Sequence, residues 1–559
     1  WINNVIVVDA SNRITFNGLM NFGEIDALRP PAQPILYEPV EVIPINPNSY
    51  APNAINADIT HVNADDVWAL GFTGEGIVVA NIDTGVNYTH EALVNQYRGN
   101  LGGSFDHNYN WFDRTPSGSD ATPNDFHNHG SHTMGTMTGS TNPADPANAE
   151  RAIGMAPGTQ WIACQAFEGA TDAEVEAELL ACGQFMLAPT TLTGANANAD
   201  LRPDVVNNSW GDCGQTYDNW YAGVIDAWVA AGIYPMFSNG NASNCGYSSP
   251  PGLNTVGNPA RSGNVTGVGS TGTSNGQYAT YSNWGPTDNP DTLNPMGYPD
   301  LKPQVVAPGT NTSAGASGDS YVGMSGTSMA SPHVAGLVAL MWNAAPCLRG
   351  NYVDTETILQ QTAIPVPYDD GTGGGAHVPN YATGWGEIDA LAAVNAAREI
   401  CRIGDLPWVS VSPITATVGA PGSVDLEVQF TCDLTATQQA QPLEGTLRIK
   451  HNDPTEEPVD VALEFFCAGA VPSPVWSKEV FVNGSPVSPI AGPHVVRPGD
   501  EVMIVDHAGA AASVPFSATL TETWTTDSLA LVDVDSGGVG WVEDGAGWMA
   551  WHLENMPSN

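Results

Sequence analysis

Three short stretches of the sequence carry side chains that could cooperate in covalent catalysis. They are "VVANIDTGV" with Asp83, "NHGSHTMGTM" with His129, and "GTSMASPHVAG" with Ser328. A serine hydroxyl becomes a nucleophile when a neutral imidazole accepts its proton and a carboxylate orients that imidazole. If the three side chains meet in the fold, they predict acyl transfer through a serine ester.

Each of these residues also has a plainer interpretation. Asp83 precedes Thr-Gly, where an aspartate commonly caps a helix or closes a turn. Ser328 stands where a Gly-Thr turn enters a helix, so its hydroxyl could be only a cap. His127, His129 and His132 are close enough in sequence to suggest a metal site, although no carboxylate or cysteine is an evident fourth ligand. A helix cap explains a hydroxyl at position 328, but it does not explain the accompanying aspartate and histidine motifs. We therefore favour catalysis.

The elements that must position these residues belong to an α/β pattern over about residues 58 to 400. Short β-branched runs alternate with helical patterns such as "TDAEVEAELLACGQFML"; the runs are "GIVVANID", "TQWIACQAF", "DVVNNSW", "GIYPMFS", "NVTGVGS" and "PQVVAPG". Buried strands separated by helices are typical of a parallel sheet covered on both faces. Asp83 would then end a strand where such sheets place active residues. Ser328 would begin a helix, whose free N–H groups favour a negative charge.

The order Asp, His, Ser and the surrounding motifs resemble the subtilisin-like serine proteases. The similarity extends from "DTG", "HGSHTMG" and "GTSMASPHVAG" through "GMAPG", "NNSWG", "KPQVVAPG" and "GWGEIDALAAV", and "HNYNWFD" and "WGPTDNP" are most similar to the bacillopeptidase-like branch. The resemblance implies that Asp83 orients His129, that His129 acts as general base and then acid, and that Ser328 attacks the carbonyl. It implies a secreted serine endopeptidase acting on polypeptide substrates.

The resemblance also implies an oxyanion hole. In "YPMFSNGNAS" the side-chain amide of Asn241 corresponds to the family's donor, which would act beside the Ser328 backbone N–H. Asn239 is the rival, because Asn-Gly-Asn offers two side-chain amides. Either asparagine could instead close a turn.

A substrate cleft is implied by two further segments. Ser209, Trp210 and Gly211 in "NNSWG" correspond to an edge strand that pairs with an extended peptide, and Gly257 in "TVGNPA" corresponds to the pocket floor. Trp210 replaces a smaller apolar residue that is common in the family. Its alternative role is core packing.

Metal binding stays open. Ala92 stands where many family members place a calcium-binding aspartate, so that calcium site is in doubt. Acidic residues elsewhere prove little in so acidic a chain. We expect no cofactor to be required for the chemistry, and we leave structural calcium unassigned.

Composition excludes some partners. Lys and Arg number 15 against 59 Asp and Glu, for a formal net charge of −44, which argues against binding nucleic acid or an anionic membrane. No apolar run reaches the ~18 residues that span a bilayer. An acidic surface suits a secreted protein or a saline habitat, and biased composition explains it equally well.

The eight cysteines fall into neighbouring couples, from which we predict four disulfides and an oxidising compartment. The couples are Cys164 with Cys182, Cys213 with Cys245, Cys347 with Cys401, and Cys432 with Cys467.

Four segments are expected. Residues 1–57 would be the C-terminal part of a propeptide with a Pro-rich linker, and residues 58–400 the catalytic domain. Alternating strands and turns predict a β-sandwich module, immunoglobulin-like, over 401–470. A second β-rich module would cover 471–559, incomplete because no closing strand is evident.

The propeptide interpretation rests on the resemblance. Its "WINNVIVV" strand would pack on the enzyme, and its tail would lie in the substrate cleft as an intramolecular inhibitor until cut within the exposed Pro-rich stretch. The alternative is a plain N-terminal extension. Because the chain begins at Trp1 without a methionine or a signal peptide, we also expect an upstream segment.

A rival function from another class remains. The protease-like domain could be the scaffold of a surface or assembly protein, with the β modules binding a cell surface or other copies. An intact triad argues against this alternative, and a serine-directed probe would separate the two.

Overall fold

The computed structural model divides the chain into two compact units, Trp1–Cys401 and Arg402–Asn559. The described residues are 29–45, 54–114, 120–272, 275–290, 296–315 and 317–401, together with the strands of the second unit. The expected propeptide strand near residue 1 therefore lies outside the described residues. So does the couple Cys432 and Cys467.

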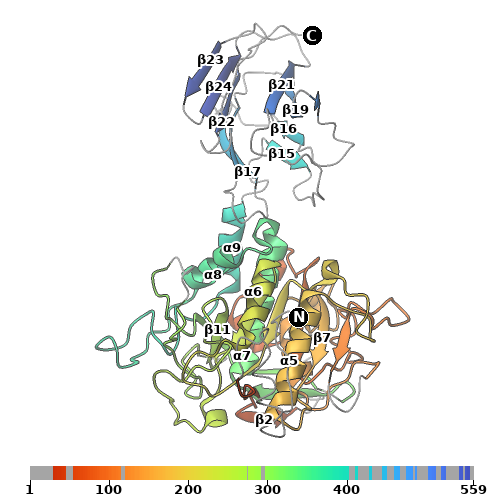
Figure 1. Cartoon of the computed structure of the whole chain (residues 1–559), viewed down its shortest axis with the longest axis vertical. Coiled ribbons are helices and arrows are strands. Elements are labelled where there is room, and N and C mark those ends of the chain that lie inside the picture. The colour runs from red at the N-terminus through yellow and green to blue at the C-terminus, as the bar shows by residue number, and fades with distance from the viewer. Residues whose placement is uncertain are drawn as a thin grey trace, which may run out of the picture. The chain divides into compact units, whose positions relative to one another are not determined.

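Seven parallel strands form the central sheet of the first unit, in the order β12-β11-β10-β8-β4-β7-β5 (Figure 1). They are β4 Val78–Asp83, β5 Trp111–Asp113, β7 Gln160–Gln165, β8 Val205–Asn208, β10 Tyr234–Ser238, β11 Thr266–Thr271 and β12 Val305–Pro308. The predicted parallel sheet is confirmed. Strands β5 and β7 lie on one side of β4, and β8, β10, β11 and β12 lie on the other. The direction of winding therefore changes beside β4, where α/β sheets bind their ligands.

Helices cover both faces of this sheet, which is why its strands read as continuous apolar runs. Along β4, Val79 enters one core, while Ala80 and Ile82 enter the other. The first core is shared with α4 His129–Thr138, α7 Thr327–Ala344 and α9 Ala390–Cys401. The second is shared with α5 Asp172–Leu187 and α6 Ala222–Ala230, which lie in front of the sheet in Figure 1.

Helix α7 runs through the interior rather than along the surface. Every residue from Thr327 to Trp342 is buried, which explains the helix's apolar and small residues on all sides. A Cβ on Gly336 would collide with the Met155 side chain and approach the backbone of Met137. The small residue therefore lets α7 approach α4 closely.

Short strands and helices complete the first unit. Two strands of the N-terminal segment pair with strands of the rest of the first unit. Strand β1 Ile35–Leu36 pairs with β9 Trp210–Gly211, and β2 Glu41–Pro44 pairs with β14 Tyr321–Ser325, which also pairs with β13 Thr310–Ala314. The remaining elements are β3 Ala54–Ile55, β6 Arg151–Ala152, α2 Ala57–His61, α3 Ala64–Ala69 and α8 Tyr352–Thr362.

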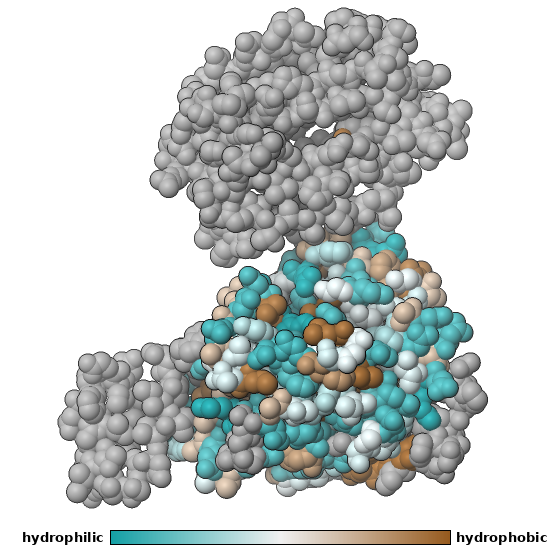
Figure 2. All heavy atoms as spheres, turned by 90° about the vertical axis from the view of Figure 1, so that its right-hand side faces the viewer, coloured by the Kyte–Doolittle hydropathy of each residue, from teal (hydrophilic) through white to brown (hydrophobic). Residues whose placement is uncertain are grey.

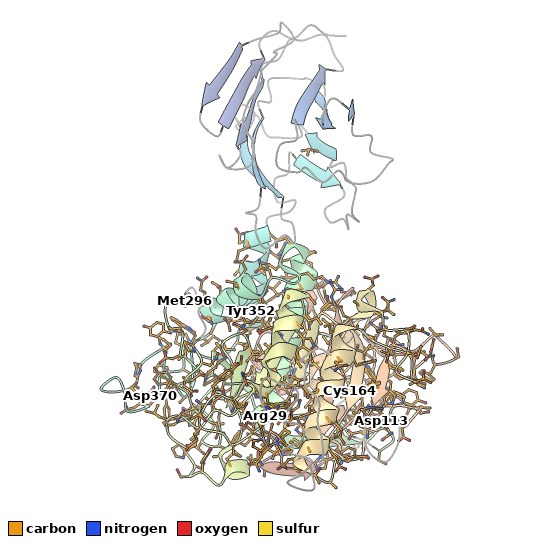
Figure 3. The ribbon with its side chains drawn as sticks, in the orientation of Figure 1. Arg29, Asp113, Cys164, Met296, Tyr352 and Asp370 are labelled. Carbon is orange, nitrogen blue, oxygen red and sulfur yellow. A yellow bond between two sulfur atoms is a disulfide. The ribbon has the colours of Figure 1, made fainter. Side chains whose placement is uncertain are left out.

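Three of the four predicted disulfides are confirmed. They are Cys164–Cys182, Cys213–Cys245 and Cys347–Cys401. The first joins β7 to α5; Figure 3 labels Cys164 beside that helix. No cysteine of the described residues is free.

The second unit contains antiparallel strands. They are β15 Val409–Ser412, β16 Glu427–Phe430, β17 Leu443–Ile449, β18 Val459–Phe465, β19 Pro474–Val482, β20 Ser485–Pro486, β21 Val502–Ala510, β22 Ala518–Thr523, β23 Trp541–Gly545 and β24 Trp548–Leu553. The final stretch, in which the sequence showed no closing strand, holds β23 paired with β24. The sandwich arrangement and its boundaries stay predictions.

The described surface is mixed. On the face shown in Figure 2, hydrophilic and hydrophobic residues are interspersed. Within the part of the chain that the structure describes, no helix is both long and apolar enough to cross a membrane.

Candidate active site

Asp83 and His129 meet at the C-terminal end of β4. The His129 Nδ1 lies 2.7 Å from Asp83 Oδ1, and both side chains are fully buried. Because an ionised carboxylate only accepts hydrogen bonds, Nδ1 is the protonated nitrogen and Nε2 carries the lone pair. Asp83 also accepts bonds from the Thr84 backbone N–H at 2.7 Å and from Thr133 Oγ1 at 3.3 Å. Its orientation is thus held from three sides.

The pKa of His129 is set by two opposing effects. Burial disfavours the charged ring, but the Asp83 charge and hydrogen bond, helped by Glu38 and Asp125, outweigh burial and raise the His129 pKa above its ordinary value. Its Nε2 is buried and has no hydrogen-bond partner among the described residues. The ring therefore keeps a basic nitrogen that no described residue occupies.

Ser328 is the second residue of α7. Its Oγ donates to the carbonyl oxygens of Tyr37, at 2.9 Å, and Ser209, at 3.3 Å, rather than to His129. The Ser328 carbonyl in turn accepts from Ser209 Oγ at 3.0 Å. The hydroxyl thus contacts a backbone carbonyl of the N-terminal segment.

Polar contacts attach both helices to the sheet. The Asn81 amide on β4 donates to the Gly130 carbonyl at 3.0 Å, which ties down the start of α4. Ser331 Oγ on α7 donates to Asn207 Oδ1 on β8 at 2.7 Å. These bonds place the first turns of α4 and α7 on neighbouring strands.

The two candidate oxyanion donors face different ways. Asn241 Oδ1 accepts from the Thr327 backbone N–H at 2.9 Å and from Thr327 Oγ1 at 3.0 Å, and its Nδ2 donates to the Glu38 carbonyl at 3.1 Å. Asn239 Nδ2 donates to the Asn283 carbonyl. The Asn241 amide therefore contacts the N-terminal segment, whereas the Asn239 amide does not, and the assignment of Asn241 to an oxyanion hole stays a prediction.

Strand β9, the segment expected to bind an extended peptide, pairs with the chain's own β1. Gly211 is paired with Ile35, and Trp210 with Leu36, in antiparallel register. The Trp210 ring points into the core, where it packs edge-on against Tyr221 at 5.2 Å between centroids. Its side chain is structural, and only its backbone lines the cleft.

A pocket of backbone atoms holds the Tyr37 ring. Tyr37 is fully buried, and its hydroxyl donates to the Asp212 carbonyl at 2.9 Å. A Cβ on Gly211 or Gly257 would collide with that hydroxyl, and one on Gly240 would press on the ring. Gly257 therefore lies against the Tyr37 hydroxyl, and its role as the floor of a substrate pocket stays a prediction.

Asp125 is a site residue that the sequence interpretation missed. Its carboxylate accepts from the backbone N–H groups of His127 at 2.9 Å, Asn128 at 3.0 Å and Ser131 at 2.8 Å, and from Thr84 Oγ1 at 2.9 Å. It closes the turn into α4. The available signal was an aspartate in the turn before a helix, where its side chain commonly accepts from the backbone N–H two residues on.

Comparison with known proteins agrees with this geometry. Residues 74–386 match the model of the subtilase family. The chain belongs to the subtilase family. It is 35% identical to Bacillopeptidase F of Bacillus subtilis over 408 residues, 71% of this chain and 26% of that protein. The predicted family is thus confirmed.

Two other relatives match smaller shares of this subtilase. It is 29% identical to Subtilisin E of Bacillus subtilis, over 52% of this chain and 61% of that protein. It is 28% identical to the extracellular protease of Xanthomonas campestris pv. campestris, over 65% of this chain and 59% of that protein. The chain therefore spans about a quarter of Bacillopeptidase F and about three fifths of the other two.

Metal ligation does not account for the histidines of this subtilase. Burial lowers the pKa of His132 to about 3, and His127 Nε2 lies 3.4 Å from Glu38 Oε2. Among the described residues, no group of three or more His, Cys, Asp or Glu side chains is arranged to hold a metal ion. Ala92 is buried. A structural calcium site stays unassigned.

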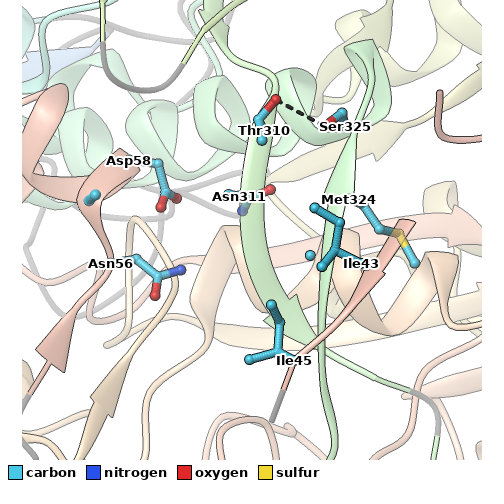
Figure 4. Close-up of a pocket in the computed structure, with 10 residues that line it drawn as sticks. Ile43, Ile45, Asn56, Asp58, Thr310, Asn311, Met324 and Ser325 are labelled. Atoms are coloured by element: carbon cyan, nitrogen blue, oxygen red, sulfur yellow. Dashed lines mark hydrogen bonds between the residues drawn. The ribbon is translucent and has the colours of Figure 1, made fainter. Parts of the chain in front are cut away.

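A separate pocket of about 320 Å³ lies beside β2 (Figure 4). Its lining residues are Ile43, Ile45, Asn56, Ala57, Asp58, Thr310, Asn311, Gly323, Met324 and Ser325. None of Asp83, His129 and Ser328 belongs to it. The wall formed by Ile43 and Ile45 is part of the N-terminal segment.

Proposed function

We propose that this subtilase is a secreted serine endopeptidase that hydrolyses polypeptides through an acyl-enzyme. One observation carries the proposal: the fully buried Asp83–His129 pair leaves Nε2 without a hydrogen-bond partner among the described residues. Ser328 Oγ contacts the Tyr37 peptide carbonyl instead of that nitrogen. A carboxylate, an imidazole and a hydroxyl in these relations are the parts of a serine nucleophile.

The roles follow from the hydrogen bonds. The Ser328 hydroxyl turns from the Tyr37 carbonyl to His129 Nε2, which takes its proton as Oγ attacks the substrate carbonyl carbon. The Asn241 amide and the Ser328 backbone N–H donate to the resulting oxyanion. His129 then passes the proton to the departing amine, and water releases the acyl group by the same steps. No cofactor takes part in this scheme.

The expected substrates are flexible, extended polypeptides. The cleft holds its peptide by main-chain pairing at Trp210–Gly211, which requires an unfolded strand. Because residues 35–44 occupy that edge and the neighbouring β14, we assign the N-terminal segment as an intramolecular inhibitor, the last part of a propeptide.

An extracellular location agrees with the disulfides and with the acidic composition. The second unit would bind a cell surface or other copies of the chain, and a calcium ion, if bound, would be structural.

Hydrolysis of a reduced and alkylated protein tests the proposal. Ser328→Ala should lower turnover by up to about 10⁶-fold, the loss that subtilisin itself shows, while circular dichroism stays that of the wild type. If mature wild type and Ser328→Ala are equally inactive, the scaffold alternative is favoured instead.

A further inference from the structure

A carboxylate on α5 takes its hydrogen bonds from a peptide that lies against the helix. Arg29 Nη2 donates to Glu176 Oε1 at 2.5 Å, and Arg29 Nη1 donates to Glu176 Oε2 at 3.1 Å. The Ala32 backbone N–H donates to the same Oε2 at 2.7 Å. The Glu176 side chain is only 2% exposed. Within the described residues, every hydrogen bond that this carboxylate accepts comes from residues 29–32.

The geometry of this contact suits arginine better than other cations. Two neighbouring guanidinium N–H groups meet the two carboxylate oxygens, which is the forked pairing that only arginine can make. A lysine would bring one ammonium group to the same place. A carboxylate covered by peptide without such donors is costly, because its charge is removed from water. Any peptide that covers Glu176 must therefore supply donors to it.

The surroundings of this contact are acidic. The hydrogen bond and charge of Glu176, together with the charge of Asp218, raise the pKa of Arg29 despite its partial burial. Asp172 lies in the first turn of α5, and the whole helix contains no lysine or arginine. A basic residue of the helix therefore does not compete for Glu176, and the local charge favours a cation over a neutral side chain.

The backbone register connects this contact to the proposed nucleophile. Downstream of Arg29, Ile35 pairs with Gly211 on β9, and the Tyr37 carbonyl contacts Ser328 Oγ. The arginine thus stands eight residues before the residue whose carbonyl lies at the serine. Prolines restrict the backbone between the two points, which keeps their spacing extended. They are Pro30, Pro31 and Pro34.

We propose that Glu176 is an arginine subsite of this subtilase, which selects polypeptides with an arginine eight residues before the residue whose carbonyl Ser328 attacks. The proposal rests on the endopeptidase activity proposed above and adds a class of substrate to it. A substrate arginine takes the place of Arg29, and the backbone three residues later donates as Ala32 does. Because Glu176 lies far along the peptide from the reacting bond, it contributes the same binding before and during the reaction. It should therefore change KM and leave kcat unaltered.

The test uses the processed protein, freed of its N-terminal segment, and quenched fluorescent peptides with one cleavable bond. Each peptide carries a copy of residues 29–34 at the observed spacing, with arginine, lysine or citrulline in the first position. Citrulline keeps the shape of arginine without its charge, so it should raise KM about tenfold at constant kcat. Lysine should give an intermediate KM. Glu176→Gln should raise KM for the arginine peptide and remove its advantage over the citrulline peptide.

Glu174, an exposed carboxylate two residues earlier on α5, supplies the matched control. Glu174→Gln should keep the full preference for arginine. A shorter peptide without the copy of residues 29–34 should be cleaved equally by wild type and Glu176→Gln, which shows that the variant is folded.

Equal KM values for the arginine and citrulline peptides in wild type would overturn the subsite. So would a preference for arginine that persists in Glu176→Gln. If the short peptide is not hydrolysed and a fluorophosphonate does not label Ser328, the endopeptidase proposal fails, and substrate selection by Glu176 fails with it.

Discussion

His129 shows how one buried contact decides the state of a side chain. Its Nδ1 is occupied by Asp83, so only Nε2 is left for the serine proton. In the proposed mechanism, the same carboxylate stabilises the imidazolium that forms once the proton has moved. One ion pair therefore sets both the tautomer and the basicity of the ring.

The first prediction concerns pH. A protonated ring cannot accept the Ser328 proton, so kcat/KM should fall as pH drops through the His129 pKa, with a midpoint above the ordinary value of about 6.5. Because Glu38 contributes to the raised pKa, release of the N-terminal segment should move the midpoint down. A pH profile of peptide hydrolysis measures it, and a flat profile between about pH 5 and 9 would contradict the assignment.

The second prediction separates two asparagines. Asn241→Ala removes the amide that faces the cleft and should lower kcat about 10²–10³-fold, as loss of this donor does in subtilisin. Asn239→Ala is the control, because that amide bonds the Asn283 carbonyl instead. It should lower the melting temperature and leave kcat close to wild type. Equal losses of kcat in the two variants would refute the choice of Asn241.

The first turns of α4 and α7 position His129 and Ser328. Helix α4 begins at His129, and Asp125 ties the preceding backbone to Thr84 beside the catalytic carboxylate. The start of α7 is tied to Asn241 through Thr327. The ends of helices, rather than their packed middles, determine the site geometry.

A third prediction follows for Asp125. Asp125→Ala leaves several backbone N–H groups unpaired, which should cost about 1–3 kcal/mol in the free energy of unfolding and lower kcat by loosening His129. Asp125→Asn keeps one acceptor oxygen, so its free energy of unfolding and its kcat should lie between those of wild type and Asp125→Ala. Thermal unfolding and steady-state kinetics measure both effects. Wild-type kcat in Asp125→Ala would show that the turn does not depend on this carboxylate.

Much of the sheet could be predicted because its strands are buried on both faces, and β-branched runs such as "GIVVANID" have few other interpretations. The triad residues stood in recognisable motifs. Tyr37 could not be placed, because two-residue strands such as β1 acquire a partner only in the folded chain. No sequence pattern could have marked the Asp212 carbonyl as the acceptor of the Tyr37 hydroxyl, since every residue carries the same backbone acceptor.

Two of the disulfides of the whole molecule differ in their distance along the fold from the candidate site. Cys213–Cys245 joins the loop after Asp212 to the turn after Asn241, so it links the segment around Tyr37 to the proposed oxyanion donor. Cys347–Cys401 joins the turn that follows α7 to the end of α9, outside the cleft.

The fourth prediction uses this difference. Replacing either couple by serines should lower the free energy of unfolding by about 2–4 kcal/mol. The Cys213–Cys245 variant should also raise KM for a peptide substrate, whereas the Cys347–Cys401 variant should keep the wild-type KM. Chemical denaturation and peptide kinetics would check both, and unchanged melting of the two variants would count against these bridges as stabilising features.

The most direct measurement of the central claim is to react the processed protein with a fluorophosphonate and map the adduct by peptide mass spectrometry. We predict a single modified serine, Ser328, with labelling lost in His129→Ala and strongly slowed in Asp83→Asn. An adduct on another serine, or labelling of Ser328 that is unaffected by removing His129, would contradict the account.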